Sequence, residues 1–291
     1  MATDAAVYAD DLICQTVPIV ENVQIAKSTF RVRFECPAIA ARVTPGQFLM
    51  LRLSQSDDPL IGRPLALYQT VDNAQGQPVA IDVVYLVGGK MTRKLSECGA
   101  HQLLDVWGPL GNGFAVQDTD HLIMVAGGIG QTPFLAVAAE HLGRRSYGTR
   151  SAAPVPRVTL CYGARSADYL AGIDDFQAVG AEVKVMTDDG TAGELGLVTE
   201  ALERVLEEAT DTTRAKVVCC GPEPMMKAVA GICESRNVPA QVSLETPMAC
   251  GIGICFTCVA PVIQQDGTTD YRRTCVEGPV FDACRIHWDA D

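Results

Sequence analysis

Four cysteines near the C-terminal end constrain the fold more than any other feature of this sequence. They follow the spacing C-x4-C-x2-C-x16-C, and they are Cys250, Cys255, Cys258 and Cys275. This is the ligand spacing of plant-type [2Fe–2S] clusters, in which three thiolates converge from one tight loop and a fourth arrives from a distant segment. Gly251 and Gly253 allow that loop to wrap closely and to point backbone amides at the sulfurs.

Two other interpretations of these cysteines remain open. Zinc sites more often use two C-x2-C pairs, and only one such pair stands here. Four unrelated buried thiols are the second alternative. Cys284 could replace Cys275 as the fourth ligand, although Cys275 is favoured because it follows the polar segment 271–274 directly. Most of the other cysteines lie in or beside apolar runs, as small buried hydrophobic residues do.

The first third of the chain reads as short strands separated by turns. Phe30, Val32 and Phe34 alternate with polar residues, and the apolar runs 48–53 and 79–87 follow. Turn residues separate these runs, and no long helical period interrupts them. The pattern predicts an antiparallel β-barrel over residues 1–117.

After residue 113 the hydrophobic period changes. Continuous apolar runs predict buried strands, and they lie at 122–126, 158–162, 183–186 and 216–220. Helical patterns alternate with them, at about 132–142, 166–179, 197–209 and 225–236. Alternating strands and helices predict a doubly wound parallel sheet over residues 118–240, with the segment 144–156 as a surface loop. Residues 241–291 lose periodicity, which fits a small module stapled by its ligand.

A glycine-rich turn at 127–133 links one of these strands to a helix. Gly128 and Gly130 would allow a close backbone approach, and the helix N-terminus would offer free N–H groups to a pyrophosphate. Thr132 is predicted to cap the helix, with Pro133 in its first position. The pattern G-x-G-x-x-P departs from the usual G-x-G-x-x-G, and a plain tight turn is the alternative.

A second loop, 220–226, also joins a strand end to a helix. Parallel sheets bind ligands at the carboxyl ends of their strands, so Cys220 and Gly221 are predicted nicotinamide-site residues. Arg165 and Ser166 follow another strand and could contact the adenosine ribose. A basic residue there leaves NAD and NADP both open.

The barrel half carries a candidate flavin site. Arg63 could supply a planar cation for a flavin pyrophosphate, although an Arg-Pro at a strand edge is often structural. The strand residues Val84, Tyr85 and Leu86 would offer a ring contact. The segment 88–92 leads into a helix with further phosphate donors.

The composition of the chain limits the kinds of partner and the cellular location that are expected. The formal net charge is −12 without a dense Lys/Arg stripe, which disfavours nucleic acid and anionic membrane surfaces. No run reaches the roughly 20 apolar residues of a membrane helix. The acidic N-terminus lacks a secretory pattern and twelve cysteines suit a reducing compartment, so a cytoplasmic location is expected.

Short sequence motifs that suggest a known superfamily are spread over nearly the whole chain. They are P-G-Q-F (45–48), R-P-L-A-L (63–67), G-P-L-G-N-G-F (108–114), G-G-I-G-Q-T-P (127–133), T-D-D-G-T-x-G (187–193) and C-G-P-E-P-M-M (220–226). Together they resemble the ferredoxin-reductase superfamily. The segments 244–258 and 275–281 are specifically similar to electron-transfer subunits of dihydroorotate dehydrogenase B.

This resemblance implies FAD in the barrel domain, NAD at the parallel sheet and a [2Fe–2S] cluster on the four cysteines. It implies an oxidoreductase subunit of pyrimidine (UMP) biosynthesis, whose FMN-containing partner oxidises dihydroorotate in a heterotetramer. No general acid or base is expected, because the cofactors carry the chemistry. Glu245 and Cys220 are the side chains expected near the flavin and nicotinamide. By the family pattern the FAD contacts are Arg63, Pro64, Leu65, Ala66, Val84, Tyr85, Leu86, Met91 and Thr92.

Three of these positions depart from the family pattern. Family members typically carry Ser or Thr at Ala66, Gly at Met91 and often Arg at Leu86. This chain therefore lacks a hydroxyl near the isoalloxazine ring, and its contacts to the flavin phosphates are expected to differ. Similar subunits serve NAD(P)H:ferredoxin oxidoreductases, sulfide dehydrogenases and hydrogenases, which makes these the nearest alternative functions. A non-catalytic zinc module on a reductase fold is the alternative from another class.

Overall fold

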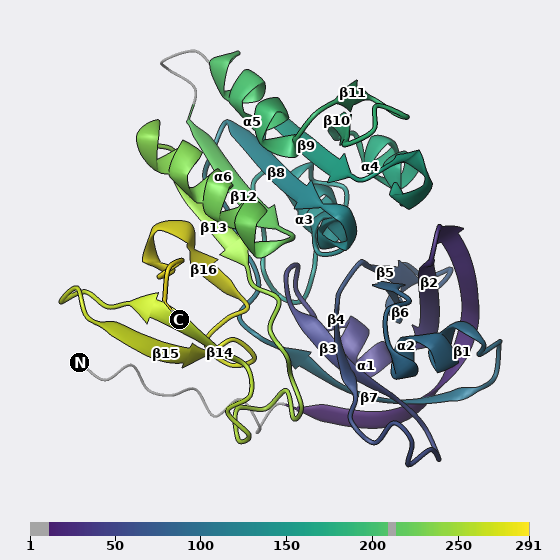
Figure 1. Ribbon diagram of the computed structural model, residues 1–291. Helices are drawn as coiled ribbons and strands as arrows, with labels where there is room; N and C mark the ends of the chain where they lie inside the picture. The colour runs from purple at the N-terminus through teal and green to yellow at the C-terminus, as the bar shows by residue number, and fades with distance from the viewer. Residues whose placement is uncertain (1–11, 209–213, 291) are drawn as a thin grey trace.

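A computed structural model of the chain describes residues 12–208 and 214–290. Residues 1–11 of the N-terminal segment expected to lack a secretory pattern, and residue 209 of the predicted helix 197–209, lie outside these ranges. The described chain forms a barrel, an α/β domain above it and a small module, yellow in Figure 1, that lies against both. Within the described ranges, no helix combines the length and apolar character that crossing a membrane requires.

The N-terminal part is the predicted antiparallel barrel. Its seven strands lie in the order β4-β3-β7-β1-β2-β6-β5 and every pair is antiparallel. Val32 and Phe34 are fully buried, as the alternation predicted. The elements are β1 (Ile13–Ala26), β2 (Thr29–Glu35), α1 (Pro37–Ala40), β3 (Phe48–Leu53), β4 (Arg63–Ala66), β5 (Gln69–Asp72), β6 (Pro78–Leu86), α2 (Lys90–Ser96) and β7 (Leu103–Leu110).

The second part is the predicted doubly wound sheet, in the order β11-β10-β9-β8-β12-β13-β16. Its strands are parallel except β16. Helices α3 and α4 share one hydrophobic core, and α5 and α6 share the other. The elements are β8 (His121–Gly127), α3 (Phe134–His141), β9 (Arg157–Ala164), α4 (Ile173–Val179), β10 (Glu182–Thr187), β11 (Glu194–Leu195), α5 (Val198–Glu207), β12 (Ala215–Cys220), α6 (Glu223–Ser235) and β13 (Ala240–Ser243).

Two helix starts differ from the prediction. A 3₁₀ turn, η1 (Gly128–Gln131), precedes α3, so the helix begins at Phe134 with Pro133 as its N-cap. The predicted cap Thr132 instead ends the 3₁₀ turn and is almost fully buried. The predicted helix over 166–179 divides into η2 (Ala167–Tyr169) and α4, because Gly172 between them has a positive φ of 74°. Local periodicity does not distinguish a 3₁₀ turn from the first turn of an α-helix.

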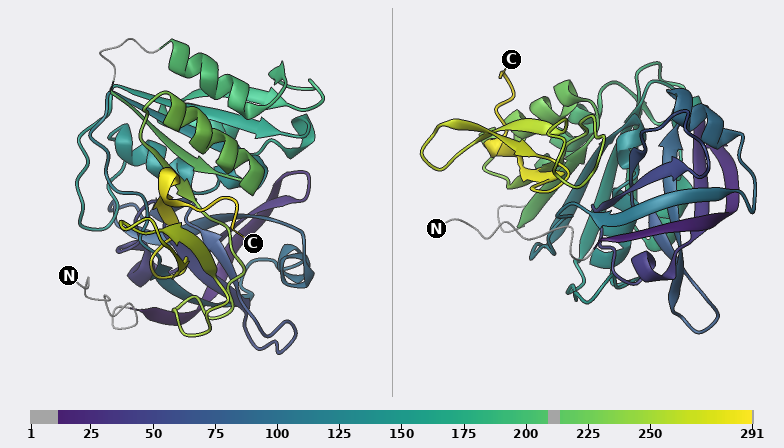
Figure 2. Two further views of the ribbon diagram at one scale, coloured as in Figure 1. Left: turned by 60° about the vertical axis from the view of Figure 1, so that its left-hand side comes forward. Right: turned by 90° about the horizontal axis from the view of Figure 1, so that it is seen from below.

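The C-terminal module leaves the α/β sheet and returns to it. β14 (Val259–Ile263) and β15 (Thr269–Arg273) form an antiparallel hairpin, and η3 (Ala283–Arg285) follows β16 (Val280–Asp282). Strand β16 pairs with β13, and the N–H of Leu244 donates to the carbonyl of Pro279 at 2.9 Å. The module therefore enters and leaves through a two-stranded neck, and Figure 2 shows it on the side of the α/β domain.

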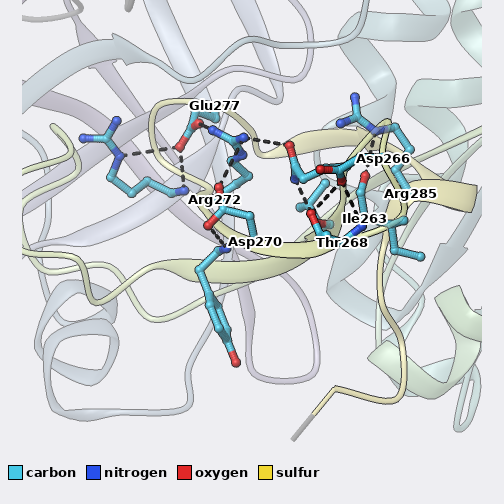
Figure 3. A network of polar contacts seen from close by, with 11 residues as sticks. Ile263, Asp266, Thr268, Asp270, Arg272, Glu277 and Arg285 are labelled. Atoms are coloured by element: carbon cyan, nitrogen blue, oxygen red, sulfur yellow. Dashed lines mark hydrogen bonds and ion pairs between the residues drawn. The ribbon is translucent and has the colours of Figure 1, made fainter.

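Polar contacts brace the hairpin, as Figure 3 shows. Arg272 donates to Glu277 at 2.9 Å and to the side-chain oxygen of Gln264 at 2.7 Å. At the tip, the Thr268 hydroxyl donates to Asp266 at 2.6 Å. These contacts fix the segment that carries Cys275 relative to the hairpin without a large hydrophobic core.

Packing holds the module against the barrel. A small apolar cluster joins Phe48, Met50 and Leu110 of the barrel to residues of the module that include Met248 and Val276. The indole Nε1 of Trp107 on β7 donates to the carbonyl of Cys250 at 3.0 Å. The loop with three of the four cysteines is therefore positioned by the barrel wall.

Candidate functional site

Two cavities meet where the barrel faces the α/β domain. The larger has a volume of about 720 Å³ and is bounded by the barrel, η1 and the segment 243–249. Most of the predicted flavin contacts line it, namely Arg63, Pro64, Leu65, Ala66, Val84, Tyr85, Leu86 and Thr92. We refer to it below as the flavin cavity.

The polar groups of the flavin cavity suit a pyrophosphate. The Arg63 guanidinium donates to the carbonyls of Ile61 at 3.1 Å and Gly62 at 3.0 Å, and among the described residues it has no carboxylate partner. The Thr92 hydroxyl accepts from the N–H of Gly88 and of Gly89, both at 3.1 Å. An unpaired planar cation beside a glycine turn is chemically suited to a diphosphate.

Met91 behaves differently from its neighbours in the predicted flavin set. Its side chain is fully buried in the barrel core and does not line the cavity. The long thioether packs inward from α2, so only its backbone could approach a ligand. The departure from Gly at this position is therefore explained by core packing.

The second cavity, of about 580 Å³, opens at the carboxyl ends of the parallel strands. It lies over the switch point of the sheet, where β8 is flanked by β9 and β12, the usual ligand position in such sheets. Gly128 and Gly221 line it as predicted. At Gly128, with φ of 54°, no atom lies within 4 Å of the position a Cβ would occupy, so the backbone is open to a ligand. We call this the nicotinamide cavity.

Three predicted nicotinamide-site residues lie elsewhere. Thr132 and Cys220 line the flavin cavity instead. Gly130 lines neither cavity, because it packs against the next loop, where a Cβ would come within 2.2 Å of the Cys220 carbonyl oxygen. The 3₁₀ turn before α3 contains Gly130 and ends at Thr132, so it directs these two positions away from the strand-end opening, whereas Cys220 is the last residue of β12.

Glu245 lies at the junction of the two cavities, as the sequence suggested. Its side chain lines both and makes no hydrogen bond or ion pair with any described residue. The side chain is exposed toward the cavities, yet the surrounding protein desolvates it and raises its pKa. Burial also raises the pKa of the neighbouring Cys220 thiol well above its usual value. Leu86 likewise lines both cavities.

Sequence reasoning missed the third wall of the flavin cavity. This wall is the segment that leads from β13 to the cysteine loop, with Ser243, Leu244, Thr246, Pro247, Met248 and Ala249. No local pattern marks these residues. The L-E-T-P-M run preceding the cysteines was available as a family motif, but its role follows from tertiary packing.

The four predicted ligand cysteines form two pairs. The sulfurs of Cys250 and Cys255 lie 3.2 Å apart, and those of Cys258 and Cys275 lie 3.1 Å apart. Within residues 12–208 and 214–290, no three His, Cys, Asp or Glu side chains gather around a single metal-ion position. Two thiol pairs, with three of the four cysteines on one loop and Cys275 after the hairpin, fit a two-iron cluster better than a single tetrahedral zinc.

The thiols of this group differ in environment. Hydrogen bonds from Thr257 lower the pKa of exposed Cys255 to about 6, which favours the thiolate. Burial raises the pKa of Cys275 to about 12. Cys284, the alternative fourth ligand, is exposed on η3 and has no thiol partner among the described residues.

Positive φ angles shape the cysteine loop. Gly251 has φ of 74° and Gly253 has φ of 83°. A Cβ at Gly251 would lie 2.6 Å from the Met50 side chain, so the loop passes close to the barrel wall. The glycines predicted for close wrapping are required by both conformation and space.

A barrel with a flavin cavity, a parallel sheet with a dinucleotide cavity and paired thiols define a flavin- and iron–sulfur-dependent oxidoreductase subunit of the ferredoxin-reductase type. Residues 16–114 match the oxidoreductase FAD-binding domain, 124–231 the oxidoreductase NAD-binding domain, and 245–287 the iron–sulfur cluster binding domain of dihydroorotate dehydrogenase B. The chain belongs to the family of dihydroorotate dehydrogenase B electron-transfer subunits.

Two family members illustrate the likeness. The subunit from Desulforamulus reducens is 32% identical over 91% of this chain and 95% of its own length. The one from Geobacillus thermodenitrificans is 33% identical, covering 94% of this chain and 98% of its own length. Both carry the name dihydroorotate dehydrogenase B (NAD(+)), electron transfer subunit.

Solved structures give the same fold. An NADH-dependent reduced ferredoxin–NADP oxidoreductase structure, described for flavin-based electron bifurcation, superimposes with a TM-score of 0.76 and 29% identity, covering 94% of this chain and 90% of the other. An Amycolatopsis cytochrome P450 reductase shares the fold with a TM-score of 0.61 and 22% identity, covering 77% of this chain and 66% of the other.

Proposed function

We propose that this chain carries electrons between NAD(H) and the FMN of a dihydroorotate dehydrogenase catalytic subunit, in pyrimidine biosynthesis and within a heterotetramer. The observation that carries the proposal is the continuity of the three sites. Glu245 borders both cavities, and Thr257 borders the flavin cavity while its hydroxyl lies 3.0 Å from the Cys255 sulfur. One connected path of protein therefore joins the nicotinamide cavity to the cysteine loop.

The bound groups would supply hydride acceptance at the flavin and single-electron transfer at the cluster. The protein holds the bound groups in position. Arg63 would hold the flavin diphosphate, and Gly128 and Gly221 would admit the nucleotide. Val84, Tyr85 and Leu86 form one wall of the flavin cavity. Ala66 also lines the cavity and, unlike Ser or Thr, offers no hydroxyl to a bound flavin.

The assignment of the four cysteines as cluster ligands is part of the same proposal. Cys250 and Cys255 would hold one iron, and Cys258 and Cys275 the other, because the sulfurs are already paired in this way. Trp107 would keep the first pair at the barrel wall through its bond to the Cys250 carbonyl.

The domain limits and location are also proposed. We assign residues 1–117 to FAD, 118–240 to NAD and 241–291 to the cluster. The family matches at 16–114, 124–231 and 245–287 support this division. Twelve cysteines without a disulfide support a reducing, cytoplasmic location.

An anaerobic titration of the purified chain with NADH tests the first half of the proposal. We expect flavin absorbance to bleach and a rhombic [2Fe–2S] EPR signal to appear. A colourless, zinc-containing preparation would contradict the electron-transfer function. Mixing the oxidised chain and NAD⁺ with an FMN-containing dihydroorotate dehydrogenase should then give dihydroorotate-dependent NAD⁺ reduction.

A second function is favoured by one comparison. The structure described for ferredoxin–NADP oxidoreductase shares 29% identity and nearly the full length with this chain. If the chain serves such a complex, reduced ferredoxin will support its turnover and dihydroorotate will not. The same mixing assay with each electron donor separates the two.

A further inference from the structure

Tyr68 joins the barrel to the α/β domain through a buried hydrogen bond. It stands two residues after β4, whose residues Arg63–Ala66 line the flavin cavity, and its side chain is fully buried. Its hydroxyl donates to the carboxylate of Asp175 on α4 at 2.6 Å. Burial, followed by this bond, raises the pKa of Tyr68, so the phenol keeps its proton and remains the donor. The bond therefore reaches from the flavin strand to a helix of the other domain.

The barrel end of this contact is held by the backbone and by packing. The N–H of Leu67 donates to the carbonyl of Gln47, and the N–H of Tyr68 donates to the carbonyl of Asp82, both at 3.0 Å. The Tyr68 ring belongs to the same hydrophobic cluster as Phe176 of α4. Because close-packed interiors leave a side chain little room to shift, the hydroxyl is presented to α4 at a fixed position.

The other end of the contact supports part of the nicotinamide cavity. A Cβ at Gly172 would come within 2.3 Å of the Tyr68 hydroxyl oxygen, and the Gly172 carbonyl accepts from the N–H of Asp175 at 3.0 Å. The preceding residue, Ala171, lines the cavity, and its N–H donates to the Tyr162 hydroxyl at 3.2 Å. Tyr162 lines the cavity as well. A shift of α4 relative to the barrel would therefore move the cavity wall.

The position of that wall matters because both domains build the nicotinamide cavity. Thr29 and Leu86 come from the barrel, whereas Ala171 comes from the α/β domain, together with Arg165, which the sequence suggested for this site. Hydride transfer requires the reacting atoms to lie within about 3–3.5 Å of each other, and a misplacement of about 1 Å can cost a hundredfold in rate. The placement of one domain on the other therefore controls the reaction geometry.

Two other polar contacts between the domains are more exposed. Lys27 pairs with Asp168 at 3.2 Å, and both side chains are more than half exposed. Arg145 donates to Asp72 at 2.8 Å and to Thr70 at 2.7 Å. None of these five residues lines either cavity. Exposed ion pairs contribute little to holding two elements together, so the buried phenol is the contact that can fix the cavity wall.

We propose that Tyr68 and Asp175 are a positioning pair that sets the separation of the flavin and nicotinamide cavities and thereby the rate of hydride transfer. The inference rests on the proposed function, because it requires a nicotinamide dinucleotide and a flavin in these cavities. Neither side chain lines a cavity, so the pair acts through Gly172 and Ala171 rather than on the reacting atoms. A hydrogen bond to a carboxylate is about twice as strong as one between neutral groups, which suits it to this task.

Tyr68→Phe in the FAD- and cluster-loaded chain tests the pair by anaerobic stopped-flow reduction with NADH. The limiting rate of flavin reduction should fall about tenfold, and the NADH–flavin charge-transfer absorbance should weaken because the rings stack less closely. The Kd for NADH should change by less than about twofold, and the FAD content should not change. Asp175→Asn keeps an acceptor oxygen and should slow reduction only about threefold. The double variant should be no slower than Tyr68→Phe, because one bond is lost in both.

Tyr147→Phe is the matched control. Tyr147 is also buried, with 2% of its surface exposed, and its hydroxyl has no hydrogen-bond partner within the described chain. Its substitution removes an oxygen without breaking a bond and should leave the limiting rate unchanged. Arg145→Gln breaks an exposed contact between the domains and should change the rate by less than about twofold. The proposal is overturned if Tyr68→Phe behaves like Tyr147→Phe, or if Arg145→Gln slows flavin reduction as much as Tyr68→Phe does.

Amide hydrogen exchange separates this proposal from the proposed function. A native chain whose flavin is not reduced by NADH would refute the electron-transfer function, and the pair would then be judged by exchange alone. Peptides covering residues 169–176 should exchange at least about fivefold faster in Tyr68→Phe than in the native chain, with Tyr147→Phe unchanged. Asp175→Asn carries both measurements if Tyr68→Phe does not fold. Native exchange rates in the folded variants would overturn the proposal.

Discussion

The nicotinamide cavity and the cysteine loop are built by different kinds of structure. The cavity lies at the ends of parallel strands whose side chains are buried in two hydrophobic cores, one on each face of the sheet. The cysteine loop rests on a small apolar cluster shared with the barrel, on positive-φ glycines and on polar bracing. The comparison indicates that the first site is formed by folding alone, whereas the second depends on its ligand for much of its stability.

The largest expected effect tests this dependence. Cys275→Ser removes one thiol of a buried pair, so we predict complete loss of the cluster and of its EPR signal. NADH–ferricyanide turnover should persist, because the nicotinamide and flavin cavities do not use this residue. Cys284→Ser is the control and should retain full iron content. Equal iron loss in both variants would contradict the ligand assignment.

A smaller effect is expected from crowding the loop. Gly251→Ala adds a methyl group 2.6 Å from Met50 at a positive φ, and should cost about 3 kcal/mol and reduce cluster occupancy. Gly267→Ala has a similar φ, 83° against 74° at Gly251, but meets no atom within 4 Å, and should cost about 1 kcal/mol. Denaturant unfolding and iron content measure both. Similar losses would mean that backbone strain, rather than barrel contact, dominates.

The α/β half should show its own acid sensitivity. Burial, followed by the charge of Arg157, lowers the pKa of His121 from 6.5 to about 4, and its ring lies 2.8 Å from the Thr159 hydroxyl. The unfolded chain binds this proton at higher pH, so stability is complete above pH 6.5 and falls by up to about 3 kcal/mol as the pH drops toward 4. Unfolding midpoints at several pH values should show a flatter profile for His121→Gln. An unchanged profile would place the acid sensitivity elsewhere.

The junction of the cavities should respond more modestly. Glu245→Gln removes the carboxylate that borders both cavities, and we expect hydride transfer from NADH to slow by about tenfold through the loss of the charge-assisted hydrogen bond that this carboxylate would make to a bound cofactor. Because the Glu245 pKa is raised, protonation of the native chain should mimic the variant at a higher pH than for an ordinary Glu. Stopped-flow flavin reduction against pH measures this. A pH dependence retained in the variant would assign it to another group.

The smallest expected effect concerns the barrel wall. Trp107→Phe keeps the aromatic packing and removes the bond to the Cys250 carbonyl, at a cost of about 1 kcal/mol. The cluster should assemble but become more easily lost to a chelator. A chelation rate equal to that of the native chain would show that the glycines alone hold the loop.

Sequence reasoning recovered the parts of the site that local chemistry dictates. The cysteine spacing located four thiols that the fold brings into pairs, and the glycines after β8 marked an open strand end. It placed Thr132 with the nucleotide, although Thr132 lines the flavin cavity, and Cys220, expected near the flavin and the nicotinamide, lines the flavin cavity. For Thr132 the difference arises from the 3₁₀ turn before α3, and such a turn leaves no trace in hydrophobic periodicity.

The inward side chain of Met91 and the wall formed by residues 243–249 were also beyond local reasoning. Met91 could be a ligand contact or a core residue by pattern alone, and the packing of α2 decided. The wall arises because the segment that follows β13 lines the flavin cavity together with residues of the barrel. Both depend on how distant elements meet.

The neck between β13 and β16 gives the chain the architecture of an inserted cassette. Leu244 and Pro279 are joined by a backbone hydrogen bond, and Val242 stands opposite Phe281, so the points of entry and exit are neighbours. A short linker that joins residue 244 directly to residue 279 would replace the cluster module and keep β16 paired with β13. Simple truncation after residue 244 would instead expose β13 as an open edge. Lineages that gain or lose such a relay could do so here without rebuilding the nucleotide domain.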